Sequence, residues 1–414
     1  MNEKIEVVAI GTEILKGFTI NTNAADIGKE LFKSGYLVSR HTVLPDQPAL
    51  LKIALQECLQ RSRIVITTGG LGPTCDDCTK KVAAEIFDSD FYFDESIAQT
   101  LKQRYGSMLI SLNDQATVPT KAFILKNEVG TAPGLVFNTP SNTLILMPGV
   151  SREMHLMLRN QVIPYLISHF PQKKRQISQA LHFFGISEST IDPSLRELEK
   201  NYPGIEFGIY PSHGTLTVSA SIETSRESEG NALLSAPLNI LAARFNKQLF
   251  ESSSGKIEET IHNLFIKNGW TLSIAESCTG GSLSAKLTQL PNASAYFLGS
   301  IVCYSNFSKE KFLGVSKDLL QTKGAVSEES VLAMASGILA STGSDFGLAI
   351  TGIAGPSGGT PDKPIGTVWI GTARKGAPPK ARLLRAHGSR QMIIERSANA
   401  ALGELLMTCL EKDA

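Results

Sequence analysis

The sequence contains no long hydrophobic run and no excess of charge of either sign. Lysine and arginine contribute 40 of its 414 residues and aspartate and glutamate contribute 39, which gives a formal net charge of +1. No apolar stretch approaches the roughly 18 uninterrupted residues that a membrane-spanning helix needs. The longest basic run is Lys173-Lys174-Arg175. We therefore expect a protein that does not enter a membrane and does not bind nucleic acid directly.

Cysteine is scarce as well. Six cysteines are scattered through a long chain, which is not the spacing of a disulfide-stapled secreted domain. The apolar stretch near the N-terminus is short and is broken by Gly11, Thr12 and Glu13, as in a strand rather than a signal peptide. We expect free thiols and a cytoplasmic location. The cysteines are Cys58, Cys75, Cys78, Cys278, Cys303 and Cys409.

Strand and helix patterns alternate through the first 170 residues. Ile5–Ile10 and residues 63–68 are continuous apolar runs, typical of strands that are buried on both faces. Residues 21–35 and 48–62 space their apolar side chains as helices do. This order predicts an α/β domain over residues 1–170, built on a doubly wound parallel sheet.

The remaining chain divides into two further parts. Residues 171–250 combine short alternating strands with two helical stretches and predict a small α+β connector domain. Residues 251–255, Glu-Ser-Ser-Ser-Gly, are the best linker candidate. Residues 256–414 alternate strand and helix again and predict a second α/β domain.

Three loops of the last part follow predicted strands, where open α/β sheets bind their ligands. The first places Ser277 on a strand-to-helix turn, so free backbone N–H groups there could hold a ligand or an oxyanion. The second carries Lys309, whose pKa a helix start and desolvation would lower. The third, residues 351–360, is rich in glycine and suits a ribose or a phosphate. Because neither His262 nor His387 falls in these loops, a Ser–Lys pair is the available nucleophilic arrangement.

Simpler interpretations exist for each of these features. Ser277 could only cap a helix, Lys309 could be an ordinary surface lysine, and the glycine-rich segment could be only a loop. Cys278 is a rival nucleophile, since a thiol at a helix start can be acidic, although a small buried cysteine is the simpler interpretation.

A second glycine-rich turn lies in the first domain, at residues 68–79. It follows a strand and opens a helix, which suits a phosphate. Asp76 and Asp77 could hold a divalent cation, or one could cap the helix while the other complements its dipole. With no second Cys/His pair nearby, Cys75-x-x-Cys78 does not predict a zinc site.

Several strings in residues 256–414 together resemble the CinA C-terminal domain family, the nicotinamide mononucleotide deamidases. The strings are Ala275-Glu276-Ser277-Cys278-Thr279-Gly280-Gly281, Tyr304-Ser305-Asn306 with Lys309, Gly324-Ala325-Val326-Ser327, and residues 351–368. The resemblance implies a deamidase without a cofactor, with Ser277 as nucleophile, Lys309 as base, and Tyr304 and Thr351 as supporting groups. It implies a substrate-binding set of Thr279, Gly280, Gly281, Gly352, Gly355, Gly358 and Arg390.

The first domain resembles the CinA N-terminal domain, which is similar to molybdopterin-binding proteins. Gly11-Thr12-Glu13, the string of residues 68–79, and Met147-Pro148-Gly149-Val150 carry this likeness. It implies an ADP-ribose pyrophosphatase that uses a divalent metal such as Mg²⁺ at Asp76 and Asp77, and a homodimer. A non-catalytic pterin- or nucleotide-binding module is the alternative. The implied nucleotide-binding residues are Thr12, Glu13, Gly69, Gly70, Gly72 and Thr74.

Overall fold

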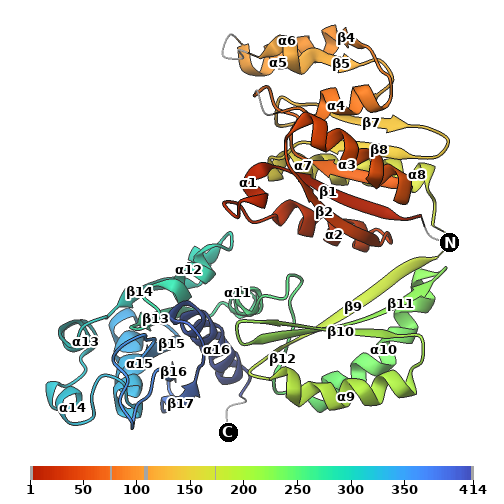
Figure 1. Cartoon of the computed structure of the whole chain (residues 1–414). Helices are drawn as coiled ribbons and strands as arrows, with labels where there is room; N and C mark the ends of the chain where they lie inside the picture. Colours follow the sequence, from red (N-terminus) through yellow and green to blue (C-terminus); the bar gives the residue numbers. More distant parts are fainter. Residues whose placement is uncertain (1–2, 75–76, 107–110, 173, 412–414) are drawn as a thin grey trace. The chain divides into compact units, whose positions relative to one another are not determined.

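The chain divides into two compact units in the computed structural model, which describes residues 3–74, 77–106, 111–172 and 174–411 (Figure 1). Unit 1 comprises residues 1–178 and 222–231, and unit 2 comprises residues 179–221 and 232–414. No helix of the described part is long and apolar enough to cross a membrane. Both units mix helices and strands, which confirms the predicted α/β class.

A six-stranded sheet forms the centre of unit 1, in the order β2-β1-β3-β8-β7-β6. β2, β1, β3 and β8 run parallel, whereas β7 and β6 are antiparallel additions at one side. The sheet is therefore mixed, and only its four parallel strands match the predicted doubly wound pattern. The strands are β1 (Ile5–Ile10), β2 (Val38–Leu44), β3 (Ile64–Thr68), β6 (Phe123–Leu125), β7 (Gly134–Asn138) and β8 (Thr143–Met147).

Helices cover both faces of this sheet because its strands are apolar on both sides. Ile5 and Val7 of β1 pack into a core with α2, while Val8 and Ile10 pack into a second core with α3. A short pair, β4 (Phe91–Phe93) and β5 (Thr117–Pro119), forms a separate small sheet. The helical segments are α1 (Thr12–Leu15), α2 (Thr22–Lys33), α3 (Pro48–Arg61), α4 (Thr79–Ile86), α5 (Glu95–Tyr105), α6 (Leu112–Ala116), α7 (Ser151–Met157), the π-helical turn η2 (Leu158–Val162) and α8 (Ile163–His169).

The connector contains a four-stranded sheet in the order β10-β11-β9-β12, with two helices, α9 (Glu188–Asn201) and α10 (Glu227–Arg244). The sequence analysis did not predict β10, which pairs with β11 across the turn His213-Gly214. Residues 251–255 form a loop, but the hydroxyls of Ser252, Ser253 and Ser254 donate to Glu259. The division between the units falls elsewhere, within β9, β11 and α10. The strands are β9 (Arg175–Phe184), β10 (Glu206–Ser212), β11 (Thr215–Thr224) and β12 (Leu249–Phe250).

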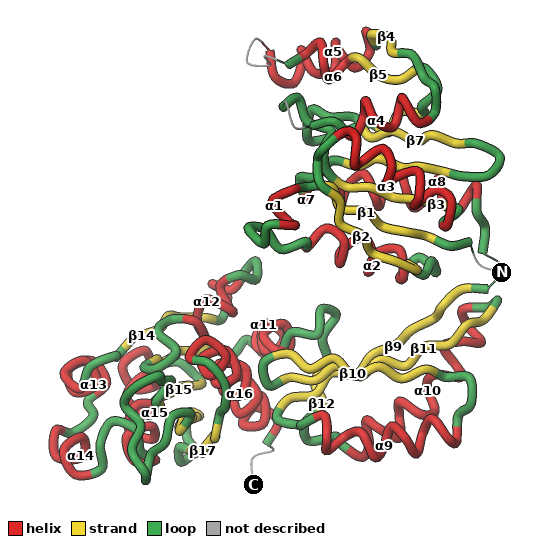
Figure 2. Tube along the Cα trace, in the orientation of Figure 1, coloured by secondary structure: helices red, strands yellow, loops and turns green. Residues whose placement is uncertain are grey.

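A five-stranded sheet forms the C-terminal part, in the order β14-β13-β15-β16-β17. Figure 2 shows strands of this part in yellow with the helices beside them in red. β14, β13 and β15 are parallel, and β16 and β17 are antiparallel to their neighbours. One core lies between this sheet and α11, α12 and α16, and the other lies beneath α13, α14 and α15. The strands are β13 (Leu272–Glu276), β14 (Phe297–Val302), β15 (Phe346–Gly352), β16 (Thr367–Arg374) and β17 (Lys380–Arg385).

The parallel strands determine where this part places its loops. The carboxyl ends of β14, β13 and β15 lie at one edge of the sheet, so the three predicted loops meet there. The helices of this part are α11 (Ile257–Asn268), α12 (Ser282–Thr288), the 3₁₀ turn η3 (Ala293–Ala295), α13 (Asn306–Leu313), α14 (Lys317–Thr322), α15 (Glu328–Thr342) and α16 (Arg390–Leu410).

Candidate active sites

Ser277 lies directly after β13, where the chain turns into α12. Its backbone N–H donates to the carbonyl of Ile350 on the neighbouring β15, at 3.0 Å. The residue is 8% exposed, so it is largely enclosed by protein. Ser277 does not cap α12, because Gly281 is the residue that precedes this helix.

Lys309 brings an amine to this hydroxyl. Its Nζ lies 2.9 Å from Ser277 Oγ and 2.6 Å from the carbonyl oxygen of Cys303. The lysine is 1% exposed, and burial lowers the pKa of its ammonium group because a low-dielectric surrounding penalises the charged form. The structure thus places an amine that is easier to deprotonate within hydrogen-bond distance of a serine hydroxyl.

Cys278, the rival nucleophile, lies in surroundings that make its thiol harder to deprotonate. Cys278 is buried, and this burial raises the pKa of its thiol to about 12. The positive charge of Lys309 acts in the lowering direction but does not offset desolvation. A thiol with such a pKa is almost entirely protonated near neutral pH, so Cys278 is a poor nucleophile.

Glu276 accepts from backbone N–H groups at the end of the Ser277 turn and at the start of α12. Its carboxylate is 0% exposed and accepts from the N–H groups of Gly281 at 3.0 Å, Leu283 at 3.1 Å and Ser284 at 2.8 Å. The N–H of Gly280 donates to the carbonyl of Ser277. The N–H groups of Gly280 and Gly281 therefore both have acceptors within the protein.

Arg390 and Tyr304 meet beside the glycine-rich loop. Arg390 begins α16, donating from Nη2 to the Tyr304 hydroxyl at 3.1 Å and from Nη1 to the Gly355 carbonyl at 2.6 Å. The Tyr304 side chain is 62% exposed, so it lies at the open side of the site. The guanidinium has donors beyond these two bonds, which suits a planar or anionic ligand group.

The other predicted residues occupy different positions around the site. Thr351 is buried, and its hydroxyl donates to the Ala325 carbonyl at 2.8 Å, which joins the glycine-rich loop to the turn before α15. The Thr279 hydroxyl is buried and has no hydrogen-bond partner among the described residues. Gly352 ends β15, and Gly358 lies in the loop that follows.

The second candidate site is a cavity of about 490 Å³ in unit 1. Of the predicted residues, Glu13, Gly69, Gly70, Gly72 and Asp77 line it. Gly69 has a φ of +110°, and a Cβ there would lie 2.2 Å from the Ile10 carbonyl oxygen, so this position requires glycine.

Two predicted threonines contact the carboxylates of this cavity. Thr12 donates its hydroxyl to Asp46, which the sequence analysis did not single out. The hydroxyl and N–H of Thr74 both donate to Asp77 Oδ2, at 2.5 Å and 3.0 Å. Asp77 therefore stabilises the turn that precedes α4, and it does not cap that helix, whose N-cap residue is Cys78.

Carboxylates are the side chains of this cavity that could bind a metal ion. Glu13, Asp46, Asp77 and Glu153 line the cavity and offer the oxygen ligands that Mg²⁺ prefers. Within the described ranges, however, no three His, Cys, Asp or Glu side chains are close enough to hold an ion together. Asp76 lies outside the described residues. The described carboxylates alone do not constitute a metal site.

Sequence reasoning missed Glu276, Asp46 and Glu153 as contributors to these sites. Each had a signal: Glu276 ends β13, Asp46 follows the carboxyl end of β2, and Glu153 lies in the first turn of α7, just after the string Met147-Pro148-Gly149-Val150. What the sequence did not reveal is which donors each carboxylate meets.

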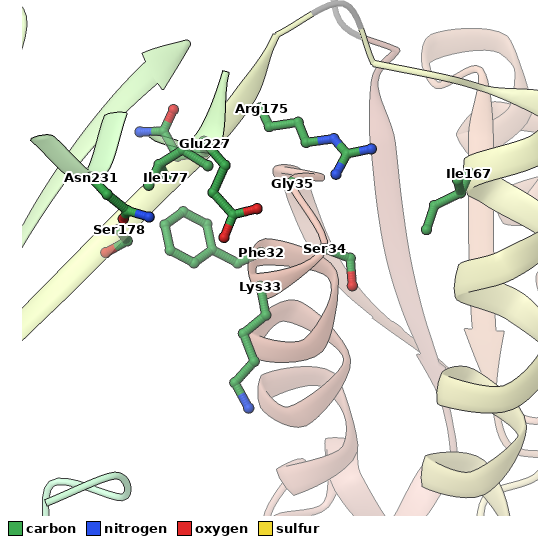
Figure 3. Close-up of a pocket in the computed structure, with 11 residues that line it drawn as sticks. Phe32, Lys33, Ser34, Gly35, Ile167, Arg175, Ile177, Ser178, Glu227 and Asn231 are labelled. Atoms are coloured by element: carbon green, nitrogen blue, oxygen red, sulfur yellow. The ribbon is translucent and has the colours of Figure 1, made fainter. Parts of the chain in front are cut away.

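A further cavity of about 320 Å³ lies in unit 1, beside the end of α2 and the start of β9 (Figure 3). Lys33, Arg175 and Glu227 are its charged lining residues. No predicted site residue lines it, so it belongs to neither candidate site.

Family models match three consecutive parts of the chain. One described as a probable molybdopterin binding domain matches residues 6–168, the damage-inducible protein CinA KH domain matches residues 178–250, and the CinA C-terminal domain matches residues 254–409. Fold and sites together thus define a multidomain α/β protein that joins a molybdopterin-binding type of domain to a domain with a buried Ser–Lys pair.

Full-length relatives establish the family. A CinA-like protein of Kosmotoga olearia is 36% identical over 96% of this chain and 97% of its own length. A protein of Clostridium kluyveri, named as competence-damage inducible, is 38% identical over 96% of this chain and 98% of its own length. The chain belongs to the CinA family, which confirms the resemblance seen in the sequence.

Solved structures of related proteins match single domains of the chain. CinA of Thermoplasma acidophilum is 37% identical, with 39% of this chain and 96% of that chain covered and a TM-score of 0.37. The competence damage-inducible protein A of Klebsiella pneumoniae is 34% identical, with 36% and 92% covered and a TM-score of 0.35.

Proposed function

We propose that the C-terminal domain is an amidohydrolase that converts nicotinamide mononucleotide to nicotinic acid mononucleotide and ammonia. The observation that carries the proposal is the contact of 2.9 Å between the Lys309 amine and the Ser277 hydroxyl, with both residues buried. Lys309 has no acidic partner among the described residues, so its neutral form is accessible.

In the proposed reaction the neutral amine of Lys309 takes the hydroxyl proton while Ser277 Oγ attacks the carboxamide carbon. The resulting tetrahedral oxyanion is stabilised by backbone N–H groups. Lys309 then returns the proton to the carboxamide nitrogen, the C–N bond breaks and ammonia leaves. Water attacks the acyl ester, its proton passes through Lys309 to Ser277, and the carboxylate product is released.

The rest of the site would hold the nucleotide. Arg390 supplies a fixed positive charge that the Gly355 carbonyl and the Tyr304 hydroxyl orient, which suits the substrate phosphate. Tyr304 exposes a ring beside it for stacking or ribose contact.

Ammonia release from nicotinamide mononucleotide tests the proposal. Purified wild-type protein should release ammonia, while Ser277→Ala and Lys309→Met should each lower kcat by about 10³-fold or more, as loss of a nucleophile or its base does. If wild type and Ser277→Ala are equally inactive, the deamidase proposal is wrong. If Ser277→Ala retains full activity and Cys278→Ala loses it, the nucleophile is misassigned.

A second activity, hydrolysis of ADP-ribose to AMP and ribose 5-phosphate, is proposed for unit 1. The cavity beside Gly69 and Gly70 favours it, because a glycine-rich turn after a strand suits a diphosphate and four carboxylates line the same space. If purified protein binds ADP-ribose but releases no AMP, unit 1 is a binding module instead.

A further inference from the structure

The carboxylate of Glu276 is fully buried and meets four donors. Besides the N–H groups of Gly281, Leu283 and Ser284, the Ser284 hydroxyl donates to Oε1 at 2.5 Å. A buried carboxylate is stable only when its lone pairs are satisfied, and these four bonds satisfy it. The side chain thereby uses the N–H groups at the start of α12, which would otherwise lack partners.

The remaining donors of the Ser277 turn can be assigned one by one. Ser277 N–H donates to Ile350, Gly280 N–H to Ser277, and Ser282 N–H to Thr279. Across the described residues, the N–H groups of Cys278 and Thr279 donate to no other residue. They directly follow the nucleophile in the chain, and the N–H after a nucleophile is a common oxyanion donor.

Glu276 also connects the turn to the loop that carries Lys309. Its backbone carbonyl accepts the Cys303 N–H at 2.8 Å and the Cys303 thiol at 3.3 Å. The carbonyl of Cys303 in turn accepts from Lys309 Nζ. The residue before the nucleophile therefore holds both the turn and, through Cys303, the base.

We propose that Glu276 is a positioning residue that engages the α12 donors and leaves the N–H groups of Cys278 and Thr279 as the oxyanion site. The inference rests on the proposed function, in that it concerns the same Ser277 nucleophile. Without the carboxylate, the N–H groups of Gly281, Leu283 and Ser284 lose their acceptor and the turn is free to rearrange. Cys278 and Thr279 would then no longer face the oxygen that becomes negative in the transition state.

The variant Glu276→Gln tests the role of the carboxylate because it leaves the volume of the side chain nearly unchanged. Its amide has one acceptor oxygen instead of two, and its NH₂ group would face donors. We expect Glu276→Gln to lower kcat by about 10²-fold, as loss of an oxyanion donor does, with KM changed by less than about threefold. Glu258→Gln is the matched control, because Glu258 is another buried glutamate of this domain and the described residues provide it with no hydrogen bond or ion pair.

Phosphonylation of Ser277 tests the role of Glu276 without depending on the identity of the substrate. Ser277 Oγ attacks the phosphorus of a fluorophosphonate, its proton passes to Lys309, the P–F bond breaks and fluoride leaves. The phosphonyl oxygen of the adduct then occupies the oxyanion site. Labelling of Glu276→Gln should be slowed about as much as kcat, and Glu258→Gln should be labelled like wild type. A folded Glu276→Gln with wild-type kcat and labelling rate would overturn the proposal.

Hydrogen exchange on the wild-type chain tests the same assignment without any substitution. The amides of Gly281, Leu283 and Ser284 should exchange slowly before and after phosphonylation, because Glu276 already holds them. Those of Cys278 and Thr279 should become protected only in the adduct. Protection that appears at Gly280 and Gly281 instead would refute the inference. This measurement needs a reactive Ser277 but no substrate. A chain that is labelled, shows the expected protection at Cys278 and Thr279 and releases no ammonia would therefore contradict the proposed substrate and leave the oxyanion site standing.

Discussion

At the scale of single residues, a comparison of the half-buried Lys80 with the buried Lys309 shows what distinguishes a candidate base. Burial lowers the pKa of both Lys80 and Lys309. Lys80 donates to the carbonyls of Asp114 and Thr117, neither of which can give up a proton. Lys309 has one carbonyl partner and one hydroxyl partner. The hydroxyl, rather than burial, gives Lys309 a proton to accept.

The pH dependence of deamidation follows from the lowered pKa of Lys309. Only the neutral amine can accept the Ser277 proton, so kcat should rise with pH and reach a plateau below 10.5, the ordinary lysine value. Lys309→Arg cannot lose its proton and should be slower by about 10²- to 10⁴-fold at every pH. A kcat that falls as pH rises from 6 to about 9 would contradict a lysine base.

At the scale of secondary structure elements, the packing of α13 on α15 decides where Lys309 lies. Gly337, in the middle of α15, faces the C-terminal end of α13, and a Cβ at this position would lie 2.0 Å from the Leu313 carbonyl oxygen. The helices approach closely enough that no side chain fits between them. Lys309 lies one turn earlier on α13, so this contact contributes to the position of its amine.

Gly337→Ala should therefore reduce both stability and catalysis. We expect a loss of about 1–3 kcal/mol, as overpacking of a core causes, and a clear decrease in kcat because α13 must move. Gly343→Ala, at the C-terminal end of the same helix, is the control. Gly343 has a φ of +70°, but no atom lies within 4 Å of an added Cβ there. Thermal melting and ammonia release measure the two effects. Equal kcat losses in both variants would show that the contact does not position the base.

At the scale of the whole molecule, the two candidate active sites lie in separate compact units. Ser277 and Lys309 belong to unit 2, and the cavity that Asp77 lines is formed by unit 1 alone. The residues that form the two sites do not overlap. The two proposed reactions should therefore depend on different side chains.

Paired variants test this separation. Ser277→Ala should lose ammonia release and keep AMP release from ADP-ribose, and Asp77→Ala should do the reverse. Asp77→Ala removes the acceptor of both Thr74 bonds, so the glycine-rich turn should lose its conformation. The family resemblance implies a divalent metal for unit 1 alone, so a chelator should abolish only AMP release. AMP release that survives the chelator would remove the metal from the proposal.

Much of the architecture could be predicted because it depends on local patterns. The helix predicted over residues 48–62 is α3, and its predicted apolar side, Leu51, Leu55, Cys58 and Leu59, is buried. Asn21 caps α2 by accepting from the Ala24 N–H. β10 was missed because its outward residues, such as Tyr210, are exposed and mixed in polarity, so no clear alternation marks it. The direction of the antiparallel strands in the six-stranded and five-stranded sheets was also beyond reach, since it depends on pairing.

The order of residues alone determined the periodic elements, the family and the loops that carry chemistry, because spacing and turn residues act over a few positions of the chain. The tertiary structure decided which groups meet. It brought an amine to a hydroxyl 32 positions away, paired the Gly281 N–H with the Glu276 carboxylate, and buried the neighbouring thiol so that it stays protonated. These outcomes depend on strand order and on exclusion of water, which arise only when distant segments pack.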